Sequence, residues 1–147
     1  MFISGQENNN DELLEIAEPD FFASDDVHVM KKGTTTGVTR GVYGGFFMST
    51  NVRFEKSPNG PFFTFENCYR IDDKKEQFFD NGDSGSGVFL LDKEDSRVKA
   101  LGIAFARWSF QPATLVCKVK HIAESFNLTI IKDDFSKKVF EHFNKYK

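Results

Sequence analysis

The residues with the clearest chemical potential lie in one glycine-rich stretch, Gly82-Asp83-Ser84-Gly85-Ser86. A serine hydroxyl can act as a nucleophile in acyl transfer when backbone N–H groups beside it receive the oxyanion that forms. Glycines permit the tight turn that points successive N–H groups at one spot, and they leave that spot open to a substrate. We therefore predict a nucleophile loop in which Ser84 is the reactive residue.

The spacing of residues in this stretch excludes two other kinds of glycine-rich loop. The serine of α/β-hydrolases lies in the pattern Gly-x-Ser-x-Gly, whereas here Ser86 stands in place of the last glycine. A phosphate-binding loop would end in Gly-Lys-Ser or Gly-Lys-Thr, and neither follows this stretch. The loop is therefore expected to serve acyl transfer and not phosphate binding.

The elements that must hold this loop are predicted to be strands. Six segments are rich in β-branched and aromatic residues: 27–32, 38–49, 62–71, 87–92, 98–106 and 113–119. Several alternate apolar and polar residues, while 98–106 lacks this alternation, as expected of a strand buried on both faces. Glycines within 38–49 indicate a bulge or a sharp bend. Six short strands at this spacing predict a mainly β domain built as a small antiparallel barrel or sandwich.

The two ends of the chain differ from this middle part. Helices are predicted at 120–128 and 133–146. The second helix carries an apolar stripe, which favours docking on the barrel over binding a partner. The stripe consists of Phe135, Val139, Phe140, Phe143 and Tyr146. At the other end, residues 13–17 have the composition of one short helical turn before Pro19.

Charge is distributed unevenly along the chain. Residues 1–26 hold eight acids and no Lys or Arg (−8), and the other 121 residues hold 14 acids and 19 bases (+5), which gives −3. The acidic segment is either a solvated tail or a segment that docks on the more basic body. The Lys and Arg residues of that body are scattered, so we do not expect nucleic acid to be a partner.

Four segments in sequence order resemble parts of chymotrypsin-like (trypsin-like) serine peptidases. Residues 82–86 resemble the nucleophile loop, and 98–106 resemble the substrate-lining strand that follows it. Residues 113–128 resemble the last strand and C-terminal helix, and 31–43 (KKGTTTGVTRGVY) resemble the segment that opens the second barrel. The resemblance covers residues 27–128 and implies the six-stranded C-terminal barrel of that fold. An acidic segment, 1–26, would precede it, and an amphipathic helix, 129–147, would follow.

The resemblance implies a role for each residue of the loop. Ser84 would be the nucleophile, and the N–H groups of Gly82 and Ser84 would form the oxyanion hole. Asp83 and Gly85 would support the loop. Asp83 would be a buried carboxylate, which requires a partner charge or hydrogen bonds.

The same resemblance implies where a peptide substrate would bind. Ala104, Phe105 and Ala106 would line the cleft in which the peptide pairs as an added strand. Phe78 would lie at the floor of the primary specificity pocket. An aromatic floor gives no support for a preference for Lys or Arg in the substrate.

The resemblance also shows what the chain lacks. In the family, a general-base His and its orienting Asp lie on a first barrel, which 26 residues cannot build. The three histidines, His28, His121 and His142, are predicted on the opening strand and on the two helices. Three hypotheses follow: a serine-endopeptidase-like domain that needs a first barrel from elsewhere, a catalytically inactive pseudoprotease that binds peptides or proteins, and a hydrolase with an unorthodox base such as His28.

Composition narrows the remaining function classes. A length of 147 residues predicts one domain, and no apolar stretch approaches the ~20 residues of a membrane span. The first residues lack the basic and apolar regions of a secretory signal, which favours the cytoplasm. In that reducing compartment Cys68 and Cys117 are expected to remain free thiols. Their spacing predicts no metal site, and no cofactor is expected.

Overall fold

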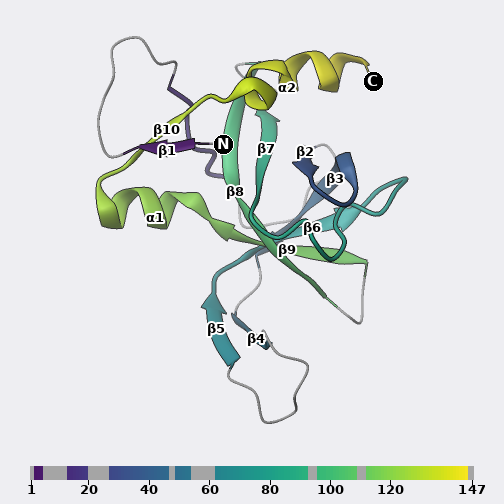
Figure 1. Cartoon of the computed structure of the whole chain (residues 1–147), viewed down its shortest axis with the longest axis vertical. Coiled ribbons are helices and arrows are strands. Elements are labelled where there is room, and N and C mark those ends of the chain that lie inside the picture. The colour runs from purple at the N-terminus through teal and green to yellow at the C-terminus, as the bar shows by residue number, and fades with distance from the viewer. Residues whose placement is uncertain are drawn as a thin grey trace.

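The computed structural model describes residues 2–4, 13–19, 27–46, 49–53, 62–92, 96–108 and 112–145. Six strands form a closed antiparallel barrel (Figure 1). These are β2 (His28–Gly33), β3 (Gly37–Phe46), β6 (Tyr69–Asp73), β7 (Ser86–Asp92), β8 (Arg97–Trp108) and β9 (Ala113–Lys118). The predicted mainly β fold with a six-stranded barrel is therefore confirmed.

The barrel strands pair in the order β2-β3-β6-β9-β8-β7, and β7 returns to β2 to close the ring. Closure is made by three antiparallel pairs between β2 and β7, among them Met30 with Phe89. The pairing of β3 with β6 shifts register between Tyr43 and Phe46. Gly44 and Gly45 fall within this irregularity, and Gly45 has a φ of 98°. The bulge or bend expected from these glycines is therefore present.

Two of the predicted strands are each divided. Segment 38–49 becomes β3 and the start of β4 (Ser49–Arg53), while 62–71 becomes β5 (Phe62–Glu66) and β6. The second division falls at Asn67, which interrupts the alternation of apolar residues and has a φ of 55°. A residue in the left-handed region cannot continue a strand. Strands β4 and β5 pair with each other and extend from the barrel as a separate two-stranded sheet (Figure 1).

Side chains on alternate positions of the strands enter two different cores. Val29, Ile71 and Leu101 belong to one apolar cluster, and each of them is fully buried. Their neighbours Met30 and Ala100 belong to a second cluster. Because both faces of β2 and β8 are covered, their sequences lack simple alternation.

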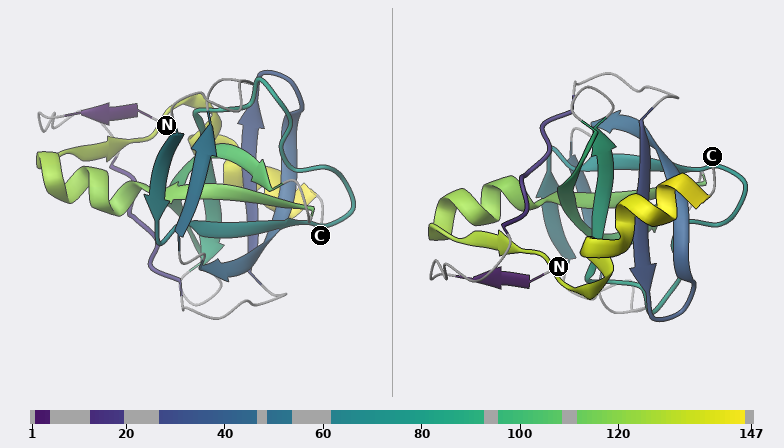
Figure 2. Two further views of the ribbon diagram at one scale, coloured as in Figure 1. Left: turned by 90° about the horizontal axis from the view of Figure 1, so that it is seen from below. Right: turned by 90° about the horizontal axis from the view of Figure 1, so that it is seen from above.

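Two helices complete this second cluster. α1 (Val119–Phe126) follows β9 directly, and α2 (Asp134–Lys145) lies across β7, β8 and β2 (Figure 2). Val139 and Phe143 of α2 are buried, so the expected docking of this helix is confirmed. Its stripe is only partly covered, since Phe140 is 43% exposed, and Tyr146 lies outside the described residues. Neither α1 nor α2, the helices in the described part of the chain, is long and apolar enough to cross a membrane.

Part of the acidic N-terminal segment docks on the barrel instead of forming a solvated tail. Leu14 N–H donates to the Ile130 carbonyl (2.8 Å), and Ala17 N–H donates to the Ala100 carbonyl (2.8 Å). β1 (Phe2–Ser4) pairs with β10 (Thr129–Ile131) beside this contact. The helical turn predicted at 13–17 was wrong, because these residues are extended and use their N–H groups to pair with other segments. The rest of segment 1–26 lies outside the described residues.

Both cysteines are free thiols: Cys68 directly precedes β6, and Cys117 lies on the neighbouring strand β9. Tyr69 pairs with Val116, which places Cys68 beside the position of Cys117. Cys68 is 1% exposed, and its burial, with a contribution from the nearby Cys117, raises the pKa of its thiol to about 11. Burial also raises the pKa of Cys117. The reactive thiolate form is therefore scarce at neutral pH.

We expect Cys68 in a Cys117→Ser variant to react with iodoacetamide about 100-fold more slowly at pH 8 in the native protein than in urea. The ordinary pKa of a cysteine thiol returns on unfolding, so the unfolded chain carries far more thiolate. The native rate should rise with pH until it levels near pH 11. Mass spectrometry of the modified peptide gives the rate, and equal native and unfolded rates at pH 8 would contradict this expectation.

Candidate active-site loop

The loop between Phe79 and β7 is built by its own backbone hydrogen bonds. Asp83 N–H donates to the Asp80 carbonyl (3.0 Å), and Ser86 N–H donates to the Asp83 carbonyl (3.1 Å). Gly85 N–H donates to Ala104 of β8 (2.8 Å), which ties the loop to the neighbouring strand. Gly82 and Gly85 have φ values of 97° and 91°, in a region that only glycine adopts readily. The two glycines thus allow the chain to reverse twice around Ser84.

Two N–H groups of this loop are not used by the loop itself. Among the residues that the structure describes, no hydrogen bond is donated by the N–H of Gly82 or of Ser84. The N–H groups of Asp83, Gly85 and Ser86 all donate to carbonyls. Unused donors on alternate residues of a tight turn can serve an anion outside the protein. These two are the donors predicted for the oxyanion hole.

The Ser84 side chain is exposed and points toward the neighbouring strand. Its hydroxyl donates to the Phe105 carbonyl on β8 (3.2 Å). A carbonyl accepts a hydrogen bond but is not basic enough to take the proton, so the hydroxyl remains protonated and weakly nucleophilic. The adjacent Ser86 hydroxyl donates to the Asp83 carbonyl (2.5 Å) and is thereby held within the loop.

Asp83 lies completely buried beneath the loop and accepts hydrogen bonds at both oxygens. Oδ1 accepts from the N–H groups of Thr35 (2.8 Å) and Thr36 (3.2 Å). Oδ2 accepts from the Thr36 hydroxyl (2.6 Å) and from Asp80 N–H (3.0 Å). Thr35 and Thr36 lie in the turn between β2 and β3, so Asp83 joins that turn to the nucleophile loop.

Lys31 supplies the partner charge that Asp83 was expected to need. Its Nζ lies 3.4 Å from Asp83 Oδ2, and both side chains are 0% exposed. Nζ also donates to the Thr36 hydroxyl (2.7 Å) and lies 5.3 Å from the centre of the Phe78 ring. Sequence reasoning did not single out Lys31. The sequence feature that could have indicated a buried lysine is its position two residues after Val29, which places both side chains on the same face of β2.

The two buried charges have pKa values shifted by opposing effects. Burial raises the pKa of Asp83, but the hydrogen bonds from Thr36, Asp80 and Thr35 outweigh it and hold the pKa well below its usual range. Burial lowers the pKa of Lys31, and the Asp83 carboxylate counteracts this in part. Asp83 is therefore ionised at neutral pH, where its charge keeps the loop attached to the turn at Thr35 and Thr36.

The residues predicted to line the cleft differ in their exposure and in their distance from the loop. β7 begins at Ser86, whose partner on β8 is Ala104, whereas β8 continues four residues further to Trp108. Ala104 is fully buried, and Phe105 and Ala106, which extend past the first residue of β7, are partly exposed. Phe78 is 0% exposed and lies in the barrel core, where its carbonyl accepts from the Thr39 hydroxyl (2.6 Å). Phe105 is thus the predicted cleft residue in contact with Ser84.

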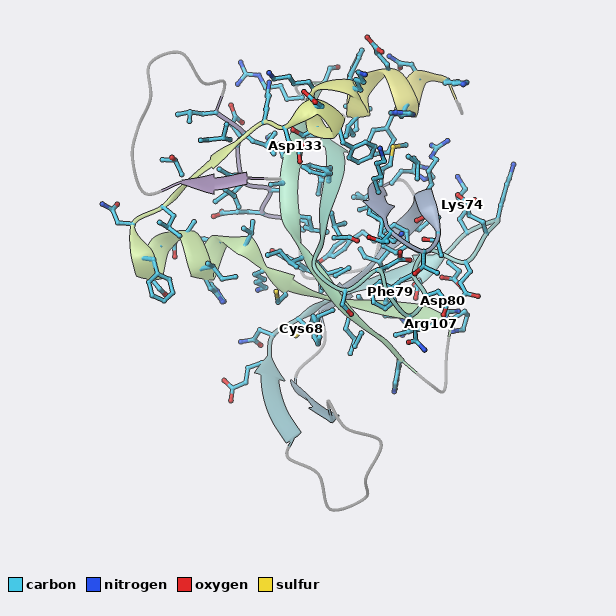
Figure 3. The ribbon with its side chains drawn as sticks, viewed as in Figure 1. Cys68, Lys74, Phe79, Asp80, Arg107 and Asp133 are labelled. Carbon is cyan, nitrogen blue, oxygen red and sulfur yellow. The ribbon has the colours of Figure 1, made fainter. Side chains whose placement is uncertain are left out.

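An ion pair that the sequence did not reveal links β8 to β6 near the nucleophile loop. Arg107 Nη2 lies 2.7 Å from Asp73 Oδ2, and Nη1 donates to the Phe79 carbonyl (3.5 Å). Asp73 Oδ1 also accepts from Phe78 N–H (3.1 Å). Figure 3 shows Arg107, Phe79 and Asp80 grouped together. The pair holds residues 78–79, which lead into the nucleophile loop, against β8.

The three histidines lie on separate elements. His28 begins β2, and its ring lies 3.4 Å from Lys74 Nζ. His121 is exposed on α1, and His142 on α2 packs against the Phe135 ring. Within the described part of the chain, no histidine is hydrogen-bonded to Ser84, and no three His, Cys, Asp or Glu side chains gather as a metal site requires.

Comparison with solved structures identifies the class of fold. The barrel matches the C-terminal barrel of chymotrypsin-like serine proteases. One similar structure is a glutamic-acid-specific serine protease that uses a histidine triad in substrate binding, with 18% identity and a TM-score of 0.51. Another is Nocardiopsis protease (NAPase), with 20% identity and a TM-score of 0.51.

These alignments cover most of this chain but only part of its neighbours. They include 83% and 85% of this chain, and 56% and 57% of the two proteases, respectively. At such identities the likeness establishes the fold. No family model matches the sequence, and no curated protein matches it either.

Proposed function

We propose that this chain is a serine-endopeptidase-like domain that carries the nucleophile and the oxyanion hole, and that a first barrel from elsewhere supplies the general base. The observation that carries the proposal is the combination of an exposed Ser84 hydroxyl with two unused N–H donors, those of Gly82 and Ser84. Acyl transfer requires this combination of nucleophile and donors.

In the proposed reaction, Ser84 Oγ attacks the carbonyl carbon of a peptide bond. The carbonyl oxygen becomes an oxyanion and accepts hydrogen bonds from the N–H groups of Gly82 and Ser84. The serine proton must pass to a base. The Phe105 carbonyl accepts a hydrogen bond from the Ser84 hydroxyl but is not basic enough to take its proton. The base then gives the proton to the leaving amine as the C–N bond breaks, which leaves an acyl ester on Ser84. Water, deprotonated by the same base, hydrolyses this ester and restores the serine hydroxyl. Catalysis therefore needs a general-base histidine that a first barrel, from elsewhere, brings next to Ser84.

The peptide is proposed to pair with the part of β8 that extends past the first residue of β7, along Phe105 and Ala106. An added strand gains backbone hydrogen bonds there, while pockets beside it select side chains. Phe78, expected at the floor of the specificity pocket, is fully buried in the barrel core and presents no surface to a substrate. It therefore gives no support for a preference for Lys or Arg. His28, His121 and His142 lie on three separate elements, β2, α1 and α2, so we do not extend the histidine triad of the glutamic-acid-specific protease to this chain.

The test uses a fluorophosphonate probe, which forms a bond to an activated serine. The chain is produced alone and together with any in-frame upstream coding sequence that encodes a barrel with His and Asp. We expect Ser84 to be labelled about 10²–10⁴-fold faster when the base is present, the usual contribution of general-base catalysis. Ser84→Ala should abolish labelling, and Ser86→Ala serves as the matched control. Absence of Ser84 labelling in every longer product would refute the proposal.

A second candidate is a catalytically inactive module that binds peptides or proteins. It is favoured by the resting contact of Ser84 with the Phe105 carbonyl and by the absence of a histidine contact to Ser84 among the described residues. Peptide binding that survives Ser84→Ala, without hydrolysis by the unchanged chain, would support this candidate. A strictly monomeric chain that binds no peptide would count against it.

A further inference from the structure

Cys68 and Cys117 occupy directly opposite positions on two adjacent segments of the barrel. The register of β6 with β9 pairs Tyr69 with Val116. Carried one residue further, this register sets Cys68, which directly precedes β6, opposite Cys117 of β9. Side chains at opposite positions of an antiparallel pair point to the same face of the sheet. The two thiols therefore lie side by side on that face.

The hydrogen-bond pattern of the same strand pair brings the two backbones close at the cysteines. Asp73 N–H donates to the Pro112 carbonyl (2.9 Å), so these two residues form a hydrogen-bonded pair. Hydrogen-bonded and non-hydrogen-bonded pairs alternate along antiparallel strands, which makes Cys68 and Cys117 a non-hydrogen-bonded pair. Cα atoms of such a pair lie ~4.5 Å apart, within the ~4.4–6.8 Å that a disulfide spans. The backbone therefore accommodates a bond between the two sulfurs without a change of register.

A separate observation also places the two sulfurs near each other. Cys117 contributes to the raised pKa of the Cys68 thiol, and such an electrostatic influence declines with distance. Both thiols are free, and the chain contains only these two cysteines. Each is therefore the only cysteine of the chain with which the other can pair.

The two thiols differ in how easily a reagent can reach them. Cys68 is 1% exposed, whereas Cys117 is half-buried. Figure 3 shows Cys68 at the point where β5 leaves the barrel. A reagent from solution therefore meets Cys117 first, and Cys68 is positioned to react second.

We propose that Cys68 and Cys117 are a redox site, which a low-molecular-weight disulfide R–S–S–R oxidises to an intramolecular disulfide that links the start of β6 to β9. The Cys117 thiolate attacks one sulfur of the reagent, and the first R–S⁻ leaves as a mixed disulfide forms. The Cys68 thiolate then attacks Cys117 Sγ and displaces the second R–S⁻. The protein sulfurs lose two electrons, the reagent gains them, and the two thiol protons pass to the released thiolates.

The proposed bond would enclose the segment from Cys68 to Cys117, a span of 49 positions (117 − 68). This segment contains the nucleophile loop, β7 and β8. A cross-link that closes a long loop stabilises the folded state because it restricts the unfolded chain. Oxidation would therefore make the segment around Ser84 more resistant to unfolding. The site does not depend on the chemistry of Ser84.

The test exposes the whole folded chain to excess oxidised glutathione at pH 8 and examines the product by intact-mass spectrometry. We expect a main product lighter than the reduced chain by two hydrogen atoms, as an intramolecular disulfide requires. In urea the register is lost, so the ratio of this product to glutathione adducts should fall at least about tenfold. The oxidised chain should unfold at a urea concentration about 1–2 M higher than the reduced chain, and dithiothreitol should reverse this shift.

Two single variants test the order of reaction and serve as controls for each other. Cys68→Ser should accumulate the glutathione adduct on Cys117, because no second thiol displaces it. Cys117→Ser should form its adduct at least about tenfold more slowly, because Cys68 is buried. Urea unfolding verifies that both variants fold, and the product of the unchanged chain requires neither variant. The proposal would be overturned by native adducts without an intramolecular disulfide, by disulfides only between chains, by equal rates in the two variants, or by an urea midpoint that does not rise.

Discussion

Replacing Lys31 by methionine is expected to lower the free energy of unfolding by about 3–5 kcal/mol, the usual cost of removing one partner of a buried ion pair. Methionine fills a similar volume without the charge. The Asp83 carboxylate would remain buried, ionised and without its cation, 0% exposed as it is now. Urea unfolding followed by the fluorescence of Trp108 measures the change.

The chain provides a close control for this substitution. Lys32 is the next residue on β2 and is exposed, so Lys32→Met removes the same charge at a cost below about 0.5 kcal/mol. Adding Asp83→Asn to Lys31→Met should recover part of the loss, because the unpaired charge is then removed as well. If Lys31→Met and Lys32→Met lowered the free energy of unfolding by similar amounts, the Lys31–Asp83 ion pair would not be what holds the loop.

Gly33→Ala is expected to cost about 3 kcal/mol through crowding and through loss of hydrogen bonds to a buried carboxylate. A methyl group built on Gly33 would overlap the Asp83 carboxylate. Asp83 would have to move away from the N–H groups of Thr35 and Thr36, which now donate to Oδ1. We therefore expect both lower stability in urea and slower fluorophosphonate labelling of Ser84 in a product that carries the base.

Gly37 is the matched control, because it pairs with Gly33 at the other end of the same turn. A methyl group on Gly37 meets no atom within 4 Å, although its φ of 69° imposes backbone strain. Gly37→Ala should therefore cost only about 1 kcal/mol, with no change in labelling of Ser84. Equal losses of stability and labelling in the two variants would mean that contact with Asp83 is not the cause.

Both expectations have a common consequence for function. The partner charge and the hydrogen bonds that hold Asp83 all come from this one barrel, from Lys31, Thr35, Thr36 and Asp80. The nucleophile loop therefore has its shape without a first barrel. Under the proposed function, a partner would need to bring only the base, because the two N–H donors are already positioned.

The sequence by itself determined the features that depend on local pattern. Apolar and β-branched patterns located the six barrel strands, by alternation in several of them and by a continuous apolar run in the doubly buried β8. The glycines around Ser84 identified the loop because few other residues adopt its backbone angles. Even the division between β5 and β6 had a local sign at Asn67, where the alternation fails.

Only the tertiary structure decided which distant residues meet. Lys31 and Asp83 are 52 positions apart (83 − 31), and no local period relates them. Arg107 reaches Asp73 because β8 and β6 both border β9 in the barrel. Residues 13–17 gave a helical pattern, yet unpaired backbone groups on β8 and β10 offered them hydrogen bonds as an extended segment. Such contacts arise from how the strands close into a barrel, which short-range spacing in a sequence does not encode.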